Sequence, residues 1–288
     1  MTAPELPRRP PAVGARGLTL LLLLVAGALS YEGLGLTAAG LAPNEGGLAV
    51  AREFFGRALS PAWTSEARFV PPGTPPLLLD ALGAAGRTVL YAAAAMSLAL
   101  VIGVVLGFLA SSSWRVGERR FLGRAATSAL WFSARAIIAA MRSVHELLWA
   151  VLLLAAMGLS DLAALVAIAL PYGGTLAKIF SELIDEAPRD AGEALRGAGA
   201  PALSVFAFAL VPRAAPDMIA YTFYRFECAL RSSAVLGFFG FPTLGLELRQ
   251  SFRSTNYGEV WTYLYVLIAL VIVFDGWSGH LRRRLVTT

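Results

Sequence analysis

The sequence predicts an all-α, polytopic membrane protein with about six transmembrane helices. The chain has 288 residues, of which 57% are hydrophobic and only 15% are charged, and its mean hydropathy is +0.65. A soluble chain needs roughly 25% charged residues to cover its surface, so part of this exterior must face lipid. The high apolar fraction excludes a disordered chain, and a single cysteine, Cys228, excludes a disulfide scaffold.

The cationic residues act as topology markers. The net charge is +5, and Lys178 is the only lysine. The arginines cluster between apolar runs, where they set membrane orientation, so we expect no nucleic-acid partner. Lys178 follows Ala177 rather than the glycine of a phosphate-binding loop, which places any ATP chemistry in a partner.

The N-terminal third contains one span and one loop. Residues 1–17 form a cytoplasmic tail and residues 18–36 the first transmembrane helix. A cleaved signal peptide is the alternative, because Arg8, Arg9 and Arg16 precede the apolar run and Ala26-Gly27-Ala28 follows it. Residues 37–83 form an extracytoplasmic loop that is broken by prolines and holds a short interfacial helix at 48–59.

Residues 84–277 hold five further spans. The second span, Ala84 to Ala110, carries Gly103 and Gly107, a spacing that can bring two helix backbones close; a plain lipid-facing helix with incidental glycines is the alternative. The densest basic loop follows it and is therefore cytoplasmic. Its arginines are Arg115, Arg119, Arg120 and Arg124.

The remaining spans follow from apolar runs and their breaks. We expect a third span from a surface helix at 121–141 that continues through 144–159, a fourth at 162–180 kinked near Pro171, a fifth at 203–224 broken by Pro212 and Pro216, and a sixth at 261–274. Each span moves the chain to the other side of the membrane. Counting spans from the cytoplasmic basic loop therefore places the charged segment 181–202 and the tail 278–288 in the cytoplasm.

Catalytic motifs are lacking. His145 and Glu146 are adjacent, but a zinc-protease helix would need a histidine where Trp149 stands. Two histidines and one cysteine make a metal site improbable, so we expect neither an enzyme nor a cofactor. His145 and Glu146 are predicted to start a helix, the carboxylate favoured by the helix dipole.

The charged segment carries the most informative pattern. Glu193-Ala194-Leu195 is followed by Gly199 and, thirteen residues later, by Pro212. This pattern resembles the cytoplasmic signature of ABC-importer permeases. A short helix from about Arg189 to Ala198 would present small residues to a groove of another protein. An amphipathic surface helix without a partner is the alternative.

Two other segments extend the resemblance. Residues 141–150 are similar to the start of the core span of phosphonate-type permeases, and residues 221–227 and 229–240 are similar to that subfamily after the fifth span. His145 replaces a usual proline, which predicts a less kinked helix. Phe241-Pro242-Thr243-Leu244-Gly245 replaces a glycine-rich stretch, which predicts a bulkier loop at the outer mouth.

The resemblance implies a type I ABC-importer permease with a cytoplasmic coupling helix. It implies a multi-pass protein of the bacterial inner membrane, with both termini cytoplasmic, that works with ABC ATPase subunits, a second permease copy or paralogue and an extracytoplasmic binding protein. The residues that it assigns to ATPase docking are Arg189, Asp190, Glu193, Ala194, Gly199 and Pro212.

Charges near the fifth span predict the substrate path. Arg225 and Arg231 would meet an anion, with Ser232 and Ser233 as hydroxyl donors. The guanidinium fork suits phosphonate, phosphite or phosphate oxygens. Alternatively Arg231 pairs with Glu227 four residues earlier. The rival function, an ion-coupled secondary transporter of a small anion, needs carboxylates within the spans, for which Glu227 and Asp275 are the candidates.

Overall fold

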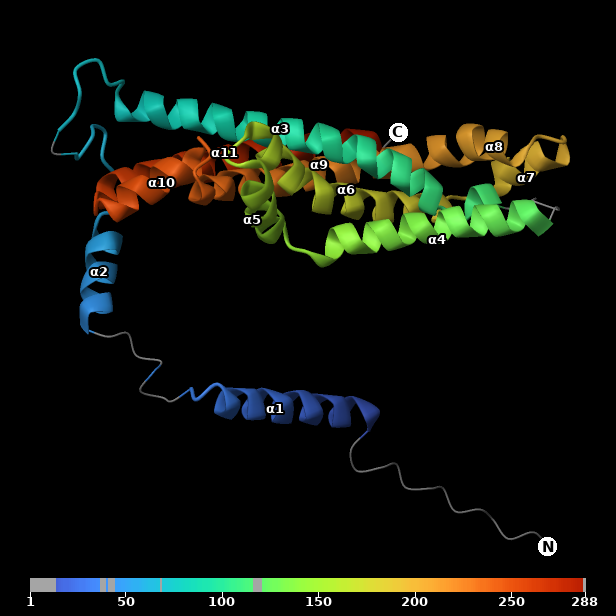
Figure 1. The fold of residues 1–288 in the computed structure, drawn as a ribbon, viewed down its shortest axis with the longest axis horizontal. Coiled ribbons are helices and arrows are strands. Elements are labelled where there is room, and N and C mark those ends of the chain that lie inside the picture. Colours follow the sequence, from blue (N-terminus) through green and yellow to red (C-terminus); the bar gives the residue numbers. More distant parts are fainter. Residues whose placement is uncertain (1–13, 37–39, 41–44, 68, 116–120, 287–288) are drawn as a thin grey trace, which may run out of the picture. The chain divides into compact units, whose positions relative to one another are not determined.

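The computed structural model describes residues 14–36, 40, 45–67, 69–115 and 121–286, and this part of the chain is all-α (Figure 1). The chain divides into two compact units, residues 1–56 and 57–288. The prediction of an all-helical protein is therefore confirmed. Arg8, Arg9, Arg119 and Arg120, on which the predicted orientation depends, lie outside the described residues.

The first unit contains α1 (Ala15–Gly33) and α2 (Glu45–Gly56). The apolar part of α1, Gly17–Gly33, is shorter than the roughly 20 residues that a typical span needs. Helix α1 coincides with the predicted first span, and its crossing of the membrane stays a prediction. Helix α2 overlaps the short helix expected at 48–59.

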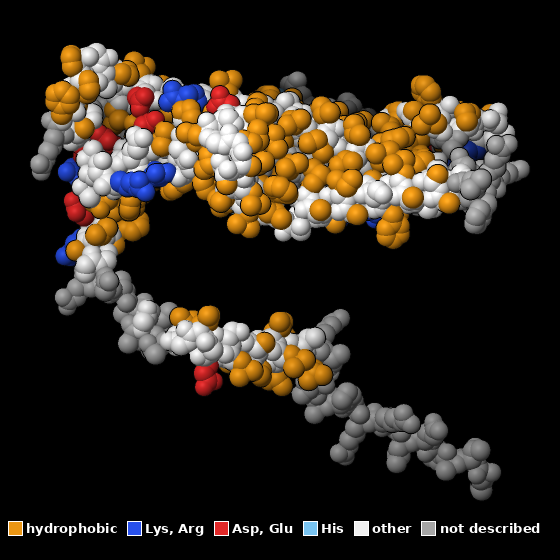
Figure 2. Space-filling model, viewed as in Figure 1, with side chains coloured by type: hydrophobic (Ala, Val, Ile, Leu, Met, Phe, Trp, Pro, Cys, Tyr) orange, Lys and Arg blue, Asp and Glu red, His pale blue; other side chains and the backbone are white. Residues whose placement is uncertain are grey.

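The second unit contains the long helices. They are α3 (Leu77–Ala110), α4 (Phe121–Ser143), α5 (Glu146–Met157), α6 (Asp161–Glu186), α9 (Val211–Val235) and α11 (Tyr257–Val286), with short helices α7 (Asp190–Gly197), α8 (Ala202–Val205) and α10 (Leu244–Arg253). In the described part of the chain, α3, α6, residues 203–239 and α11 are long and apolar enough to cross a membrane, and α4 with α5 forms one further, bent candidate. Figure 2 shows hydrophobic side chains gathered over the long helices of this unit.

Several helices extend beyond the spans predicted from hydropathy. Helix α3 begins at Leu77, seven residues before the predicted span, directly after Pro76, because the missing proline N–H costs nothing at a helix start. Helix α9 continues to Val235 rather than ending at Tyr224, so the charges expected at its end lie inside the helix. Helix α11 runs to Val286, so most of the predicted tail 278–288 is helical.

The chain bends sharply between α4 and α5, so the expectation of a less kinked helix was wrong. The axes of Ala125–Ser143 and Glu146–Met157 differ by 91°. His145 has extended backbone angles and caps α5, since its Nδ1 accepts a hydrogen bond from the Leu147 N–H at 3.3 Å. The predicted helix start at His145 and Glu146 is confirmed, and a capping side chain accompanies the break where the resembling permeases have proline.

The fifth span contains one break rather than two. A π-helical turn, Phe206–Leu210, precedes Pro212, whereas Pro216 lies inside α9. Proline has no N–H to donate to the residue four positions earlier, and the wider turn accommodates this loss.

The segment predicted as a loop at the outer mouth is tightly packed and leads into α10. Thr243 is fully buried and its Oγ1 donates to the Ala234 carbonyl at 3.1 Å. A Cβ at Gly245 would lie 2.0 Å from the same carbonyl oxygen. Only glycine permits this approach, so the segment packs tightly against the end of α9.

Helices α3 and α6 touch through their backbones. A Cβ at Gly103 would lie 2.7 Å from the Leu176 Cβ, and one at Gly107 would lie 3.1 Å from the Ala177 carbonyl oxygen. From the other side, a Cβ at Gly173 would lie 3.3 Å from the Ala99 carbonyl oxygen. The close-approach interpretation of the two α3 glycines is confirmed.

This contact predicts that a glycine-to-alanine substitution changes the stability of the fold differently at two positions of α3. Gly103→Ala is expected to lower the free energy of unfolding by about 1–3 kcal/mol, because the added methyl separates the helices. Gly86→Ala, where a Cβ meets nothing within 4 Å, is expected to be neutral or stabilising. Thermal unfolding of the detergent-solubilised chain measures both, and equal stability of the two variants would contradict the close contact.

Candidate functional site

A cavity of about 310 Å³ opens where α5 begins, and we call it the bend cavity. Its lining comes from three helices that are distant in sequence. The start of α5 contributes His145, Glu146 and Leu147, the middle of α6 contributes Tyr172, and α9 contributes Cys228, Arg231, Ser232 and Val235. The bend after α4 therefore places the first turn of α5 beside α6 and α9.

Hydrogen bonds join the three helices around the bend cavity. The hydroxyls of Tyr172 and Ser232 lie 2.8 Å apart, and the Ser232 hydroxyl donates to Glu146 Oε1 at 3.0 Å. His145 Nε2 lies 3.5 Å from the Glu146 carboxylate. Tyr172 is only 3% exposed, so this network fixes the inner wall of the cavity.

The two predicted arginines have different surroundings. Arg231 lines the cavity, its side chain is 52% exposed, and its Nη1 lies 3.5 Å from Glu227 Oε1, so the predicted pair forms. Arg225 does not line the cavity. Its guanidinium lies 4.2 Å from the centroid of the Tyr172 ring, and its buried Nε has no hydrogen-bond partner within the described residues.

The two predicted serines also have different surroundings. Ser232 belongs to the network above, whereas Ser233 is fully buried with its hydroxyl 2.9 Å from the carbonyl oxygens of Thr88 and Leu230. The structure therefore brings Arg231 and Ser232 to the cavity and turns Ser233 toward α3. Tyr172 and Glu146 are further members of the site, and no local sequence pattern marks them.

The predicted docking residues gather around α7, and we call residues 189–200 the elbow (Figure 1). Arg189 precedes the helix, and Glu193 and Ala194 are exposed. Gly199 has a φ of +85°, a left-handed conformation that favours glycine, so it turns the chain back toward α8. Pro212, also exposed, lies at the start of α9.

Polar interactions hold the elbow and the helix that leads into it. Asp190 forms a two-point ion pair with Arg213, whose Nη2 donates to Oδ2 at 3.0 Å. Asp185, near the end of α6, accepts hydrogen bonds from the hydroxyls of Ser111 and Ser113 at 2.6 and 2.8 Å. The elbow is thus anchored to α9, while the helix that leads into it is tied to the end of α3.

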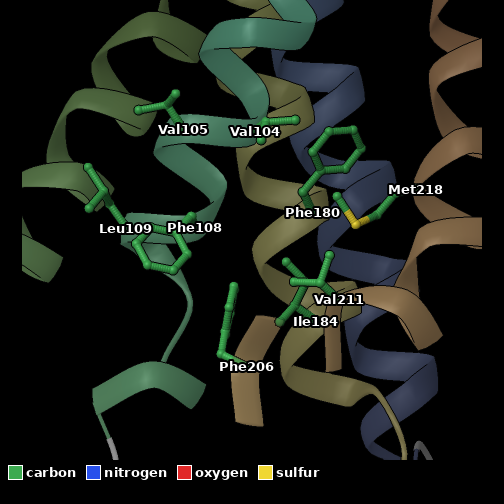
Figure 3. A pocket seen from close by; sticks show the side chains of 9 residues that line it. All are labelled: Val104, Val105, Phe108, Leu109, Phe180, Ile184, Phe206, Val211 and Met218. Carbon is green, nitrogen blue, oxygen red and sulfur yellow. The ribbon is translucent and has the colours of Figure 1, made fainter. Parts of the chain in front are cut away.

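A second large cavity has a different chemistry. It measures about 350 Å³ and lies among α3, α6, the π-helical turn and α9 (Figure 3). All nine lining residues are apolar, among them Phe108, Phe180 and Phe206. Without a polar group it is unsuited to an oxyanion, in contrast to the bend cavity.

The fold and the site define a polytopic transport subunit: apolar spans surround a polar cavity, and a charged elbow projects from the bundle. The chain belongs to the family described as "Binding-protein-dependent transport system inner membrane component", whose model matches residues 103–287. It is therefore a multi-pass inner-membrane protein and a transport subunit rather than an enzyme.

Curated relatives are named for phosphorus oxyanions. The chain is 36% identical over 150 residues to the phosphite transport system permease protein PtxC of Stutzerimonas stutzeri, covering 52% of this chain and 54% of that protein. It is 30% identical over 219 residues to the phosphate-import permease protein PhnE of Mycolicibacterium smegmatis, covering 76% of this chain and 39% of that protein. The chain thus spans about half the length of these relatives or less.

Solved structures show the same fold. The inward-facing MetNI methionine ABC transporter matches with a TM-score of 0.62 and 21% identity, covering 72% of this chain and 96% of that chain. An amino acid ABC transporter matches with a TM-score of 0.59 and 16% identity, over 72% and 94% of the two chains. The fold is that of ABC-importer transmembrane subunits, as predicted.

The Asp190–Arg213 pair predicts how the elbow responds to pH. Hydrogen bonds from Arg213 lower the pKa of the Asp190 carboxyl. A lowered folded-state pKa means that the pair stabilises the elbow above the unfolded pKa of about 3.9 and is lost only as the pH falls through the lower, folded value. Hydrogen exchange in α7, corrected for intrinsic rates, should therefore show equal protection between about pH 5 and pH 8.

Asp190→Asn should speed this exchange at both pH values, because the amide cannot replace the charged pair. Asp217→Asn, an exposed position on α9, is the matched control and should leave α7 unchanged. Loss of protection in the unmodified chain on acidification to about pH 5 would contradict the assignment.

Proposed function

We propose that the chain is the membrane-spanning subunit of an ATP-driven ABC importer that carries phosphonate or a related phosphorus oxyanion. The observation that carries this proposal is the bend cavity, where Arg231 is half-exposed beside the hydroxyls of Ser232 and Tyr172. The guanidinium fork suits tetrahedral oxyanions. The two hydroxyls, which already form hydrogen bonds with each other and with Glu146, shape the wall beside it. The relatives' names, phosphite and phosphate permeases, support the same substrate class.

The proposed partners follow from the family and from the elbow. The family is binding-protein dependent, which supports an extracytoplasmic protein that delivers the substrate. ABC ATPase subunits would bind the elbow from the cytoplasm through Glu193, Ala194 and Gly199. The other predicted docking residues would stabilise the conformation of the elbow, and they are Arg189, Asp190 and Pro212. A second permease copy or paralogue would complete the path, and both termini would be cytoplasmic.

The site also suggests how Arg231 would bind substrate. Its pair with Glu227 is 3.5 Å long, and the Arg231 side chain is 52% exposed whereas that of Glu227 is 12% exposed. The exposed side of the guanidinium would therefore bind an incoming oxyanion while Glu227 keeps its partner. Arg225, stacked on Tyr172, would supply a second positive charge behind the ring that faces the cavity. The ion-coupled alternative lacks the support that family membership gives to the importer.

Reversing a charge on the elbow tests ATPase docking. Glu193→Lys should lower substrate uptake and binding-protein-stimulated ATP hydrolysis at least about tenfold, because a like charge at an interface costs several kcal/mol. The measurement uses proteoliposomes that contain the chain, its ATPase and its binding protein, with radiolabelled phosphite as substrate. Gly199→Pro should act in the same direction, since proline cannot adopt the φ of +85°.

Glu53→Lys, an exposed position on α2, is the matched control for the charge reversal. Wild-type uptake and ATP hydrolysis in Glu193→Lys and Gly199→Pro would show that the elbow does not dock the ATPase.

Neutralising Arg231 tests substrate contact. Arg231→Gln should raise the KM for uptake about tenfold or more, because a hydrogen bond to a charged group contributes about 1.5–3 kcal/mol. Arg231→Lys should recover part of the affinity, since it keeps the charge and loses the fork. Arg282→Gln, whose native pair with Asp275 lies at the far end of α11, serves as control. An unchanged KM in Arg231→Gln would rule out direct contact.

A further inference from the structure

A smaller cavity, about 140 Å³, lies where the end of α3, the second half of α4 and α6 meet, and we call it the cationic cavity. Three of its lining residues are cations: Arg135, Arg142 and Lys178. Only one, Glu182, is a carboxylate. The cavity shares no lining residue with the bend cavity.

The charges of this cavity do not balance. Lys178 Nζ donates to both oxygens of Glu182 at 2.7 Å, so these two charges cancel. Arg135 donates its Nε to the Ala110 carbonyl at 3.3 Å and lies 4.4 Å from the centroid of the Trp131 ring, neither of which neutralises it. Among the described residues, Arg142 forms no ion pair. Two net positive charges therefore face the cavity.

Helix packing positions the stem of Arg142 in this cavity. A Cβ at Gly174 would lie 2.9 Å from the Met141 Cβ and 3.1 Å from the Arg142 Cγ, so this glycine admits the stem of Arg142 against α6. Arg135 and Arg142 are seven residues apart, two turns on one face of α4. Both guanidinium groups thus stand beside the Lys178–Glu182 pair.

The surrounding helices are apolar, so the unbalanced charges require water or an anion. Helix α6 is a candidate span, and α4 is part of the bent one. An arginine that faces lipid near the bilayer centre costs at least about 2.5 kcal/mol. Arg135 and Arg142 are nevertheless both exposed in the isolated chain. The exposed side of this cavity therefore faces an aqueous path rather than lipid.

The cavity lies between the two sites already described. Along α6, Tyr172 of the bend cavity precedes Lys178 by six residues, a rise of about 9 Å, and Asp185 and the elbow follow. We propose that the cationic cavity is a second binding site for a phosphorus oxyanion, occupied after the bend cavity as the substrate moves toward the elbow. This assignment rests on the proposed import function and adds a site to it.

Cysteine labelling tests the site independently of transport. Ala139 lines the cavity and Ala140, the next residue of α4, does not. In a Cys228→Ser background, which removes the only native thiol, Ala139→Cys in the full chain in nanodiscs should react about tenfold faster with a sulfonate-bearing methanethiosulfonate than with the trimethylammonium analogue, because the local potential is positive. Inorganic phosphate, the probe anion, should slow the reaction.

Two comparisons complete the labelling test. Ala140→Cys should show neither the charge preference nor protection by phosphate, and adding Arg142→Gln to Ala139→Cys should abolish both. An Ala139→Cys thiol that is unreactive, or that reacts equally with both reagents, would overturn the second site while leaving the proposed import function intact.

Transport kinetics give a second measurement. In the proteoliposomes described above, Arg142→Gln should lower the maximal rate of phosphite uptake about tenfold with little change in KM, because substrate is captured at the other cavity. Arg142→Lys should restore most of the rate, and ATP hydrolysis stimulated by the binding protein should persist in both. A wild-type maximal rate in Arg142→Gln would overturn the proposal, whereas loss of uptake in every variant with the ATPase silent would instead implicate the proposed function.

Discussion

The backbone contact between α3 and α6 is the constraint on which the rest of the structure depends. Gly103 and Gly107 on one helix, and Gly173 on the other, leave no room for a Cβ between the two backbones. Gly174, the next residue, faces α4, where a Cβ would lie 2.9 Å from the Met141 Cβ. Helix α6 therefore holds two neighbours at fixed distances. Its remaining side chains, Tyr172 and Lys178 among them, contribute to the two polar cavities.

Many of the helices are predictable because runs of apolar residues mark their positions in the sequence. The spans near 84–110, 162–180 and 261–274 and the short helix near Glu193 appear where apolar or charged runs predict them. The bend at His145 was not predictable from the resemblance, which links the break to proline. A capping interaction of one side chain with the Leu147 N–H replaces it. The extension of α9 was missed because its charges resemble a helix end.

The candidate site was only half predictable, for a geometric reason. Arg231 and Ser232 follow from their position after an apolar run. Their partners Tyr172 and Glu146 lie 60 and 86 residues away from Ser232, and local spacing contains no trace of such contacts. Ser233 shows the opposite error, because adjacent helical residues point about 100° apart and only one of two neighbours can face the cavity.

The charges along the proposed path give it a direction. In the bend cavity the charged lining residues are Arg231 and Glu146, and Arg231 also pairs with Glu227, so the resting charge is not positive. In the cationic cavity, nearer the elbow, Glu182 offsets only Lys178. An oxyanion released from the first would be attracted toward the second. The Asp185 hydrogen bonds to Ser111 and Ser113 join the ends of α6 and α3 beside this cavity, so a displacement of the elbow would move both helices together and alter the second site directly.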